Sequence, residues 1–170
     1  GVDIGVIVAA SRMKHPLDAR TLARLAASFA GDGPGEVVGF GLSNDERVGS
    51  TASFAPAFRI ARRAGLVGVP HGGELLGPSS VREVVSTLAP ARLGHGVRTS
   101  EDPDLLKAVV DAGIALEVCP TSNVHLGVYT DLAGAVADSD VGRGYRRAGC
   151  RRPAAVPLAP GRPVRGRARR

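Results

Sequence analysis

Residues 66–74 read Leu-Val-Gly-Val-Pro-His-Gly-Gly-Glu, an apolar run that ends in a histidine, two glycines and a glutamate. Two segments of similar form follow, Arg-Leu-Gly-His-Gly at residues 92–96 and Leu-Glu-Val-Cys-Pro-Thr-Ser-Asn at residues 116–123. Each places polar groups that can bind metal or transfer protons where a buried strand opens into a loop. A parallel α/β barrel carries its chemistry at that end of its strands. The three segments therefore predict a barrel-type fold.

Along the rest of the chain, strand-like and helix-like segments alternate. Apolar runs rich in valine and isoleucine are separated by segments of helical spacing, which indicates βα units around a parallel sheet. The expected strands are Asp3–Ala9, Glu36–Phe40, Leu66–Pro70, Arg92–Gly94 and Ile114–Val118. The expected helices are Asp18–Phe29, Phe54–Ala64, Ser80–Leu88 and Asp102–Ala112. An eight-stranded barrel typically needs about 250 residues, so we expect an α/β fold that is a partial TIM barrel of about five βα units.

Composition favours one soluble domain without a membrane span. The chain has 170 residues, of which 44% are hydrophobic, and its longest apolar stretches fall well short of the roughly 20 residues that a spanning helix needs. Two cysteines in unlike settings indicate a reducing, cytoplasmic compartment. Cys119 ends an apolar strand, so we expect it to be buried. The chain begins at Gly1 apparently inside a strand, which suggests a missing preceding segment.

The basic charge is concentrated at the end of the chain. Ten arginines and one aspartate lie between Ser139 and Arg170, whereas residues 1–138 have a net charge of −3. We therefore divide the chain into a barrel-like region, 1–138, and an Arg/Pro/Gly-rich tail, 139–170. The tail cannot bury enough apolar area to offset its ordering entropy, so we expect disorder. Its Arg, Pro, Ala and Gly bias is also typical of a GC-rich gene read in the wrong frame, which is the interpretation we favour.

The candidate chemical groups lie at the strand ends. His71 directly follows an apolar run, and a neutral imidazole there is a good Zn²⁺ ligand. Glu74, three residues on, is expected to face the same space. His95 lies between Gly94 and Gly96, which allow a close backbone approach. A histidine at a strand end is by itself more often structural than a ligand, and the three segments together favour function.

In order and spacing, from about Gly1 to about Leu132, these motifs resemble the adenosine deaminase family of zinc aminohydrolases. The resemblance implies hydrolytic deamination of a purine nucleoside at its 6-amino group. By this resemblance His71 binds zinc and Glu74 donates a proton to a ring nitrogen. His95 polarises and orients the attacking zinc-bound water.

Two loops resemble regions beside the active site of that family. Ser122 and Asn123 fall in a loop similar to its Cys-Pro-x-Ser motif, although turn stabilisation alone would also select these residue types. Asn44 stands where the family has a glycine whose backbone amide contacts the purine, and asparagine tolerates unusual backbone angles. We take these three residues as substrate-binding, and we expect His125 to be an exposed loop histidine.

The substrate stays open among adenosine, adenine and 6-amino-6-deoxyfutalosine. The string Gly-Phe-Gly-Leu-Ser-Asn-Asp-Glu-Arg at residues 39–47 resembles an actinobacterial branch that deaminates the last of these. Arg12 could then serve an acidic group on the substrate, although a solvated or salt-bridged arginine is the favoured interpretation.

Other parts of the family pattern have no counterpart. The His-x-His pair and the Asp-Asp pair are missing, which leaves His71 as one zinc ligand of four. We therefore expect neither tight zinc binding nor turnover by the isolated chain. We also expect exposed strand edges, since the sheet cannot close.

Two other functions compete. A non-catalytic barrel fragment could bind nucleic acid or another acidic partner through the arginine-rich tail, with a steep salt dependence. Another amidohydrolase-like barrel could act on a different amine or amide, but the glutamate-bearing motif fits purine protonation better.

Overall fold

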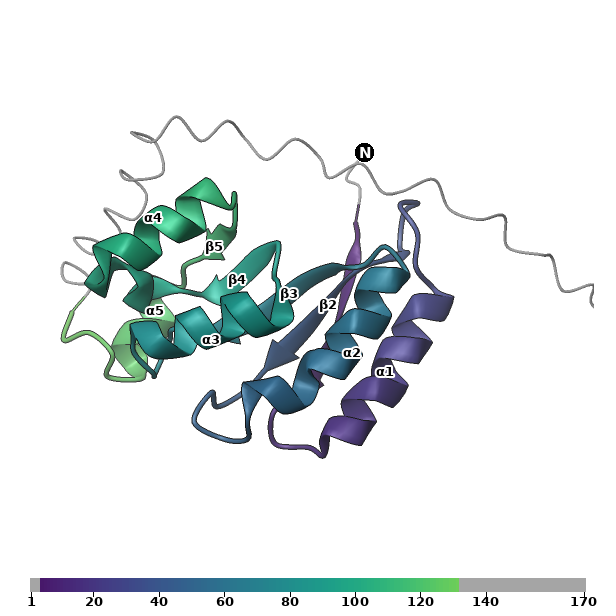
Figure 1. Ribbon diagram of the computed structural model, residues 1–170, viewed down its shortest axis with the longest axis horizontal. Helices are drawn as coiled ribbons and strands as arrows, with labels where there is room; N and C mark the ends of the chain where they lie inside the picture. Colours follow the sequence, from purple (N-terminus) through teal and green to yellow (C-terminus); the bar gives the residue numbers. More distant parts are fainter. Residues whose placement is uncertain (1–3, 132–170) are drawn as a thin grey trace, which may run out of the picture.

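The computed structural model describes residues 4–131, in which strands and helices alternate (Figure 1). The strands are β1 Val6–Ser11, β2 Val37–Ser43, β3 Val67–Gly72, β4 Arg92–His95 and β5 Ala115–Glu117. The helices are α1 Pro16–Ser28, α2 Thr51–Arg63, α3 Pro78–Leu88, α4 Pro103–Asp111 and α5 Pro120–His125, with a 3₁₀ helix, η1, at Val97–Glu101. The predicted tail, 139–170, and the last residues of the predicted barrel region lie outside the described residues.

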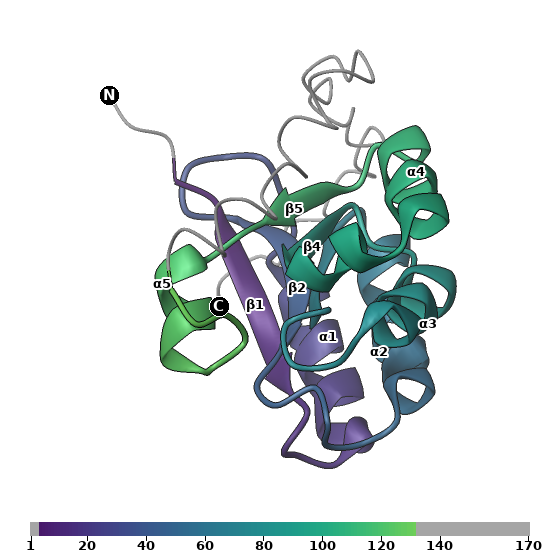
Figure 2. The ribbon, with the colours of Figure 1, turned by 90° about the vertical axis from the view of Figure 1, so that its left-hand side faces the viewer.

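The sheet has the simplest parallel order. The strands pair in sequence, β1-β2-β3-β4-β5, and all four neighbouring pairs are parallel. Helices α1 to α4 cover one face of the sheet, and α5 lies apart from them (Figure 2). Right-handed crossovers between adjacent parallel strands place successive helices on the same face, as in a barrel wall. The prediction of an α/β fold with about five βα units is confirmed.

Local sequence explains most helix starts. Prolines occupy the first position of α1, α3, α4 and α5, where the missing N–H costs nothing. The side chain of Asp102 accepts a hydrogen bond of 3.0 Å from the backbone of Leu105 and so caps α4. Helix α3 begins after Gly77 without a side-chain cap.

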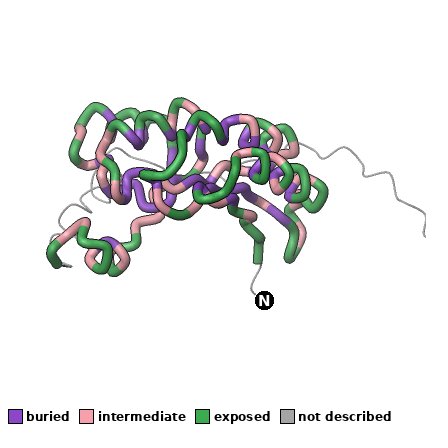
Figure 3. The backbone as a smooth tube through the Cα atoms, turned by 90° about the horizontal axis from the view of Figure 1, so that it is seen from below, coloured by how far each residue is buried: buried purple, intermediate pink, exposed green. Residues whose placement is uncertain are grey.

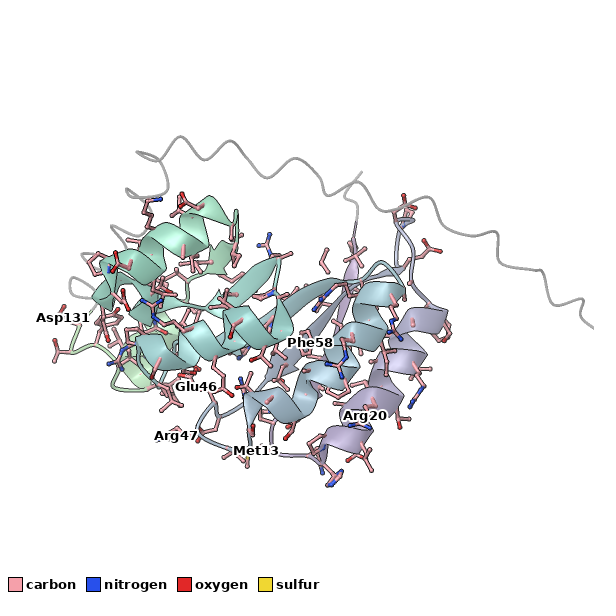
Figure 4. The ribbon with its side chains drawn as sticks, in the orientation of Figure 1. Met13, Arg20, Glu46, Arg47, Phe58 and Asp131 are labelled. Atoms are coloured by element: carbon pink, nitrogen blue, oxygen red, sulfur yellow. The ribbon has the colours of Figure 1, made fainter. Side chains whose placement is uncertain are left out.

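The core lies between the helices and the sheet. Buried residues gather at this junction, whereas the outer faces of the helices are exposed (Figure 3). Three alanines, Ala19, Ala23 and Ala26, are the buried residues of α1. Phe40 of β2 packs edge-on against Phe58 of α2, which is labelled in Figure 4, with ring centroids 5.3 Å apart. This sheet-to-helix packing holds the strands in their order.

Two surface features bear on the expectations from the sequence. The edge strand β1 is largely exposed, with Val6 40% and Ile7 45% accessible, as expected for a sheet edge. Cys119, expected to be buried, is exposed, because it follows the end of β5 and immediately precedes α5. None of the helices in residues 4–131 is long and apolar enough to cross a membrane.

Truncation of Phe40, one member of the core aromatic pair, should destabilise the fold strongly. Phe40 is fully buried, so Phe40→Ala should lower the free energy of unfolding by about 3–5 kcal/mol. Phe29, which follows α1 and is 62% exposed, supplies the control. Its alanine variant should change the same quantity by less than about 0.5 kcal/mol. Urea unfolding measures both, and equal losses would contradict the assigned core.

Candidate active site

The register between β3 and β4 brings three polar side chains together. His71 lies opposite Gly94, and Gly72 lies opposite His95, so both histidines stand at the carboxyl ends of adjacent strands. Glu74 follows in the loop after β3. The possible ligand atoms of His71, Glu74 and His95 all lie within 4.8 Å of one another. The sequence-predicted zinc ligand and the two predicted catalytic residues thus form one cluster.

The contacts within this cluster are close. The imidazole rings of His71 and His95 meet edge to face, with centroids 4.8 Å apart and an angle of 84°. His95 Nδ1 lies 3.3 Å from Glu74 Oε1. This approach lacks the alignment of a hydrogen bond, since Nδ1 has no partner of acceptable geometry.

Glycine and a strained backbone make room for the rings. A Cβ atom at Gly94 would lie 2.5 Å from Cδ2 of His71, so any other residue at this position would displace the imidazole. His95 itself has φ +65°, in the left-handed region that few non-glycine residues adopt. Such strain is typical of functional sites, where the surrounding structure imposes it.

A cleft of about 410 Å³ opens above these residues. This volume is within the usual range for small-molecule sites, about 300–1,000 Å³. Its lining comes from the loops at the carboxyl ends of β2, β3 and β4, and from α5, and consists of Ser43, Asn44, Asp45, Arg47, His71, Glu74, Leu75, His95, Ser122 and Leu126. The cleft therefore lies where the carboxyl ends of the parallel strands meet.

The three residues predicted to bind substrate lie in different settings. Asn44 and Ser122 line the cleft, and Asn44 has φ +72°, the unusual backbone angle for which asparagine was expected to be suited. Asn123 is fully buried beneath the cleft beside His95. His125 is exposed at the end of α5, as predicted.

Sequence reasoning missed several residues of the site. Asp45, Arg47, Leu75 and Leu126 also line the cleft. Asp45 and Arg47 form an exposed ion pair of 2.6 Å in the loop after β2 (Figure 4). The charged run at residues 44–47, directly after an apolar strand, was the available signal, but such a run is also typical of a solvated turn.

The favoured interpretation of Arg12 as solvated or salt-bridged is wrong. Only 2% of the residue is exposed. Its guanidinium donates to Thr51 Oγ1 at 3.2 Å and to the backbone oxygen of His71 at 3.3 Å. Arg12 follows β1, and the packing of that strand against β2 carries it under the cleft, which the sequence alone does not reveal.

Burial shifts the protonation of the cluster in two directions. Burial raises the pKa of Glu74; the nearby His71 opposes this shift, and Glu46 and Asp45 add to it. Burial also lowers the pKa of His71, with a further contribution from His95. The pKa of His95 is lowered by burial as well, against the opposing effect of Asn123. The site thus favours a neutral carboxyl group beside two neutral imidazoles.

The donor set fits a transition-metal ion. Two imidazoles and one carboxyl group are the residue types of a common set of catalytic zinc ligands, which leaves one coordination position open. Glu74 would have to lose its proton to serve as one of them. The lowered pKa values of both histidines favour the neutral, metal-binding form. The structure thus places two further donors beside His71, which motif matching had identified as the one ligand present.

The family profile for adenosine deaminase matches residues 1–136. The chain belongs to the adenosine deaminase family. A Streptomyces virginiae protein, provisionally assigned as an adenosine/adenine deaminase, is 60% identical over 129 residues, which cover 76% of this chain and 37% of that protein. An adenine deaminase of Chelativorans is 44% identical over 133 residues, 78% of this chain and 40% of its own length.

Solved structures agree with the assignment of the fold. The adenine deaminase of Arthrobacter aurescens superposes with a TM-score of 0.71 at 31% identity, over 82% of this chain and 41% of its own. An amidohydrolase of Burkholderia ambifaria with bound zinc superposes with a TM-score of 0.63 at 27% identity, over 71% of this chain and 32% of its own. An Arabidopsis relative complexed with IMP superposes with a TM-score of 0.64 at 25% identity, over 74% of this chain and 35% of its own. The described sheet is therefore part of the deaminase barrel.

The chain spans about 40% of the length of the curated relatives that it matches. The cluster at His71 lies within the matched part.

The raised pKa of Glu74 should appear in the pH dependence of stability. Between the ordinary pKa of 4.5 and the higher pKa in the folded chain, the folded state holds a proton that the unfolded state has released. The free energy of unfolding should therefore fall as pH rises through this window. Glu74→Gln should remove that decrease, as measured by urea unfolding across a pH series.

Glu83→Gln is the matched control, because Glu83 is exposed on α3. Its pH profile should follow that of the wild type. His71 and His95 affect the pH dependence of stability in the opposite direction. Their pKa values in the folded chain lie below the ordinary 6.5, so the free energy of unfolding rises with pH between the folded and ordinary values in every variant. A Glu74→Gln profile that superimposes on the wild type would contradict burial of this carboxyl group.

Proposed function

We propose that this chain carries part of the active site of a zinc-dependent aminohydrolase that deaminates a 6-aminopurine nucleoside. In this reaction water adds to the ring carbon that bears the amino group, and ammonia leaves to give the 6-oxopurine. The observation that carries the proposal is the convergence of His71, Glu74 and His95 in one cleft at the carboxyl edge of the sheet.

Glu74 acts as the proton donor in this proposal. Water addition requires a proton on the adjacent ring nitrogen, which a carboxylic acid can supply only if it stays protonated near neutral pH. Burial raises the pKa of Glu74 in the required direction. Its place on the cleft wall leaves the carboxyl group accessible to a purine ring.

His95 orients the attacking water. Its lowered pKa leaves the ring neutral, so that one nitrogen can accept a hydrogen bond or a proton. Its backbone angle and its edge-to-face contact with the ring of His71 restrict the ring, and the buried Asn123 lies near it. We assign Asn123 a supporting role beneath the substrate, and Asn44 and Ser122 direct contacts with the purine or its sugar.

His71 would hold the metal ion, together with donors from this cluster or from elsewhere in the enzyme. Zn²⁺ bound there would lower the pKa of a water molecule and so supply a nucleophile at neutral pH. The zinc in the Burkholderia ambifaria relative supports this assignment. The IMP complex of the Arabidopsis relative supports a purine ligand. Adenosine and 6-amino-6-deoxyfutalosine are the substrates we propose, and adenine is the base to compare with them.

A chimera tests the proposal without depending on the length of this chain. The matched residues of this chain replace their counterparts in the Streptomyces virginiae relative, once the parent protein has been shown to deaminate a purine. Ammonia release from adenine, adenosine and aminodeoxyfutalosine is then measured. The chimera should be active, and Glu74→Gln should lower kcat/KM by about 10²–10⁴-fold, the usual contribution of an acid–base group.

Glu83→Gln serves again as the control, and we expect its kcat/KM to stay within about twofold, as for an exposed surface change. A folded, active chimera in which Glu74→Gln matches this control would refute the role of Glu74. A folded chimera that is inactive on every one of the three substrates would refute the proposed function.

His71 should determine the metal content of the same chimera. His71→Ala should lose most of its bound zinc, as measured by elemental analysis after dialysis, because a ligand is removed. His125→Ala removes an exposed histidine of the same chemistry, and its zinc content should equal that of the parent. Equal zinc content in both variants would contradict the assignment of His71.

A further inference from the structure

We propose that Glu46 is a positioning residue whose carboxylate fixes the loop at residues 73–76, and that Arg12 holds the end of β3 from which this loop starts. The consequence for catalysis rests on the proposed function. The arrangement of the loop itself does not.

Glu46 accepts hydrogen bonds from four donors on and beside this loop. The backbone N–H of Gly73 donates to Oε2 at 2.8 Å, and those of Leu75 and Leu76 donate to Oε1. The hydroxyl of Ser80 donates to Oε2 at 3.3 Å. Only 5% of Glu46 is exposed, and its side chain extends from the loop between β2 and α2 toward α3 (Figure 4). One carboxylate therefore ties the loop after β2 to the loop after β3 and to the first turn of α3.

The charge of Glu46 matches this environment. A buried carboxylate is costly unless its lone pairs are satisfied, and both oxygens of Glu46 have donors. The side chain also lies at the N-terminal end of α3, where the helix dipole favours a negative charge. A glutamine would present an NH₂ group to backbone donors on one side and leave them without an acceptor.

Arg12 contacts the end of β3, directly before the loop. Its Nη2 donates to the backbone oxygen of His71 at 3.3 Å, and its Nη1 donates to Thr51 Oγ1 at 3.2 Å. The buried guanidinium is attracted by Glu46. The two opposite charges thus hold the loop by the carbonyl of His71 and by the amides of the residues that follow.

The position of Glu74 depends on these bonds most directly. It lies between Gly73 and Leu75, whose N–H groups are bound by the two oxygens of one carboxylate. The backbone of Glu74 is therefore held on both sides. This keeps its carboxyl group close to His95, with 3.3 Å between Glu74 Oε1 and His95 Nδ1. The four hydrogen bonds of the Glu46 carboxylate go to backbone amides and to Ser80, and none of them to a side chain proposed to touch substrate. Besides its electrostatic effect on Glu74, we therefore infer that it acts through the loop.

Amide hydrogen exchange of the full chain tests the proposal. In the wild type, the N–H groups of Gly73, Leu75 and Leu76 should be protected at least about 100-fold over an unstructured peptide, although they lie in a loop. Glu46→Gln should lower this protection at least about tenfold at these three amides, since hydrogen bonds to a charged acceptor are lost. The core amides of Leu93 and Val109 report any global change in stability.

Glu36→Gln is the matched control, because the Glu36 carboxylate also accepts from a loop amide, that of Gly33 at 2.7 Å. Its exposed loop carries none of the cluster, so the three amides should keep their protection. The ring NMR signals of His71 and His95 should shift in Glu46→Gln, whereas those of exposed His125 should not. This local signature separates positioning from a general loss of stability.

The proposal is overturned if the three wild-type amides exchange as freely as an unstructured peptide. It is also overturned if Glu46→Gln affects them no more than Leu93 and Val109. Should that variant fail to fold, the wild-type protection still decides. Absence of deamination in the chimera would refute the proposed function and leave the exchange result unaffected, so the two failures are distinguishable.

Discussion

The parallel pairing of β3 with β4 is the constraint on which the site depends. This register places His71 beside Gly94 and brings the ends of the two strands level. His95, one residue beyond Gly94, leaves the extended conformation (φ +65°), and its ring lies against that of His71. The absence of a side chain at Gly94 then allows the ring of His71 to lie against the neighbouring backbone. Because side chains alternate along a strand, a fully extended backbone at His95 would direct its ring to the face opposite His71. The cluster therefore follows from the sheet register together with the local backbone at His95 and the loop that carries Glu74.

The packing of helices on one face maintains that register. Apolar side chains from α2 and α3, among them Phe58 and Val84, are buried against the sheet. The polar residues gather instead at the carboxyl edge, where the strands give way to loops. This separation lets a stable apolar layer support a region with unfavourable features, including the backbone angle of His95 and the buried charges of Arg12 and Glu46.

The proposed deamination gives these features a common explanation. The proposed reaction uses a protonated acid, a neutral base and a metal ligand close together, and the pKa of each group shifts in a predictable direction when water is excluded. Burial favours the neutral form of Glu74 and of both histidines at once. The chain covers about 40% of its relatives, and within that part it holds three groups suited to this chemistry.

The sequence by itself determined the order of the strands and helices, since their periodicity and their glycine and proline signals are local. It also identified His71, Glu74 and His95 as candidates, because each follows an apolar run. It failed where burial depends on neighbours distant in the chain. Cys119 was expected inside and is exposed, Arg12 was expected to be solvated or salt-bridged and is buried, and Glu46 was not distinguished from the charged turn around it. Only the tertiary structure decided these positions, because the desolvation and the partners of a side chain come from other strands and helices, and no local pattern records them.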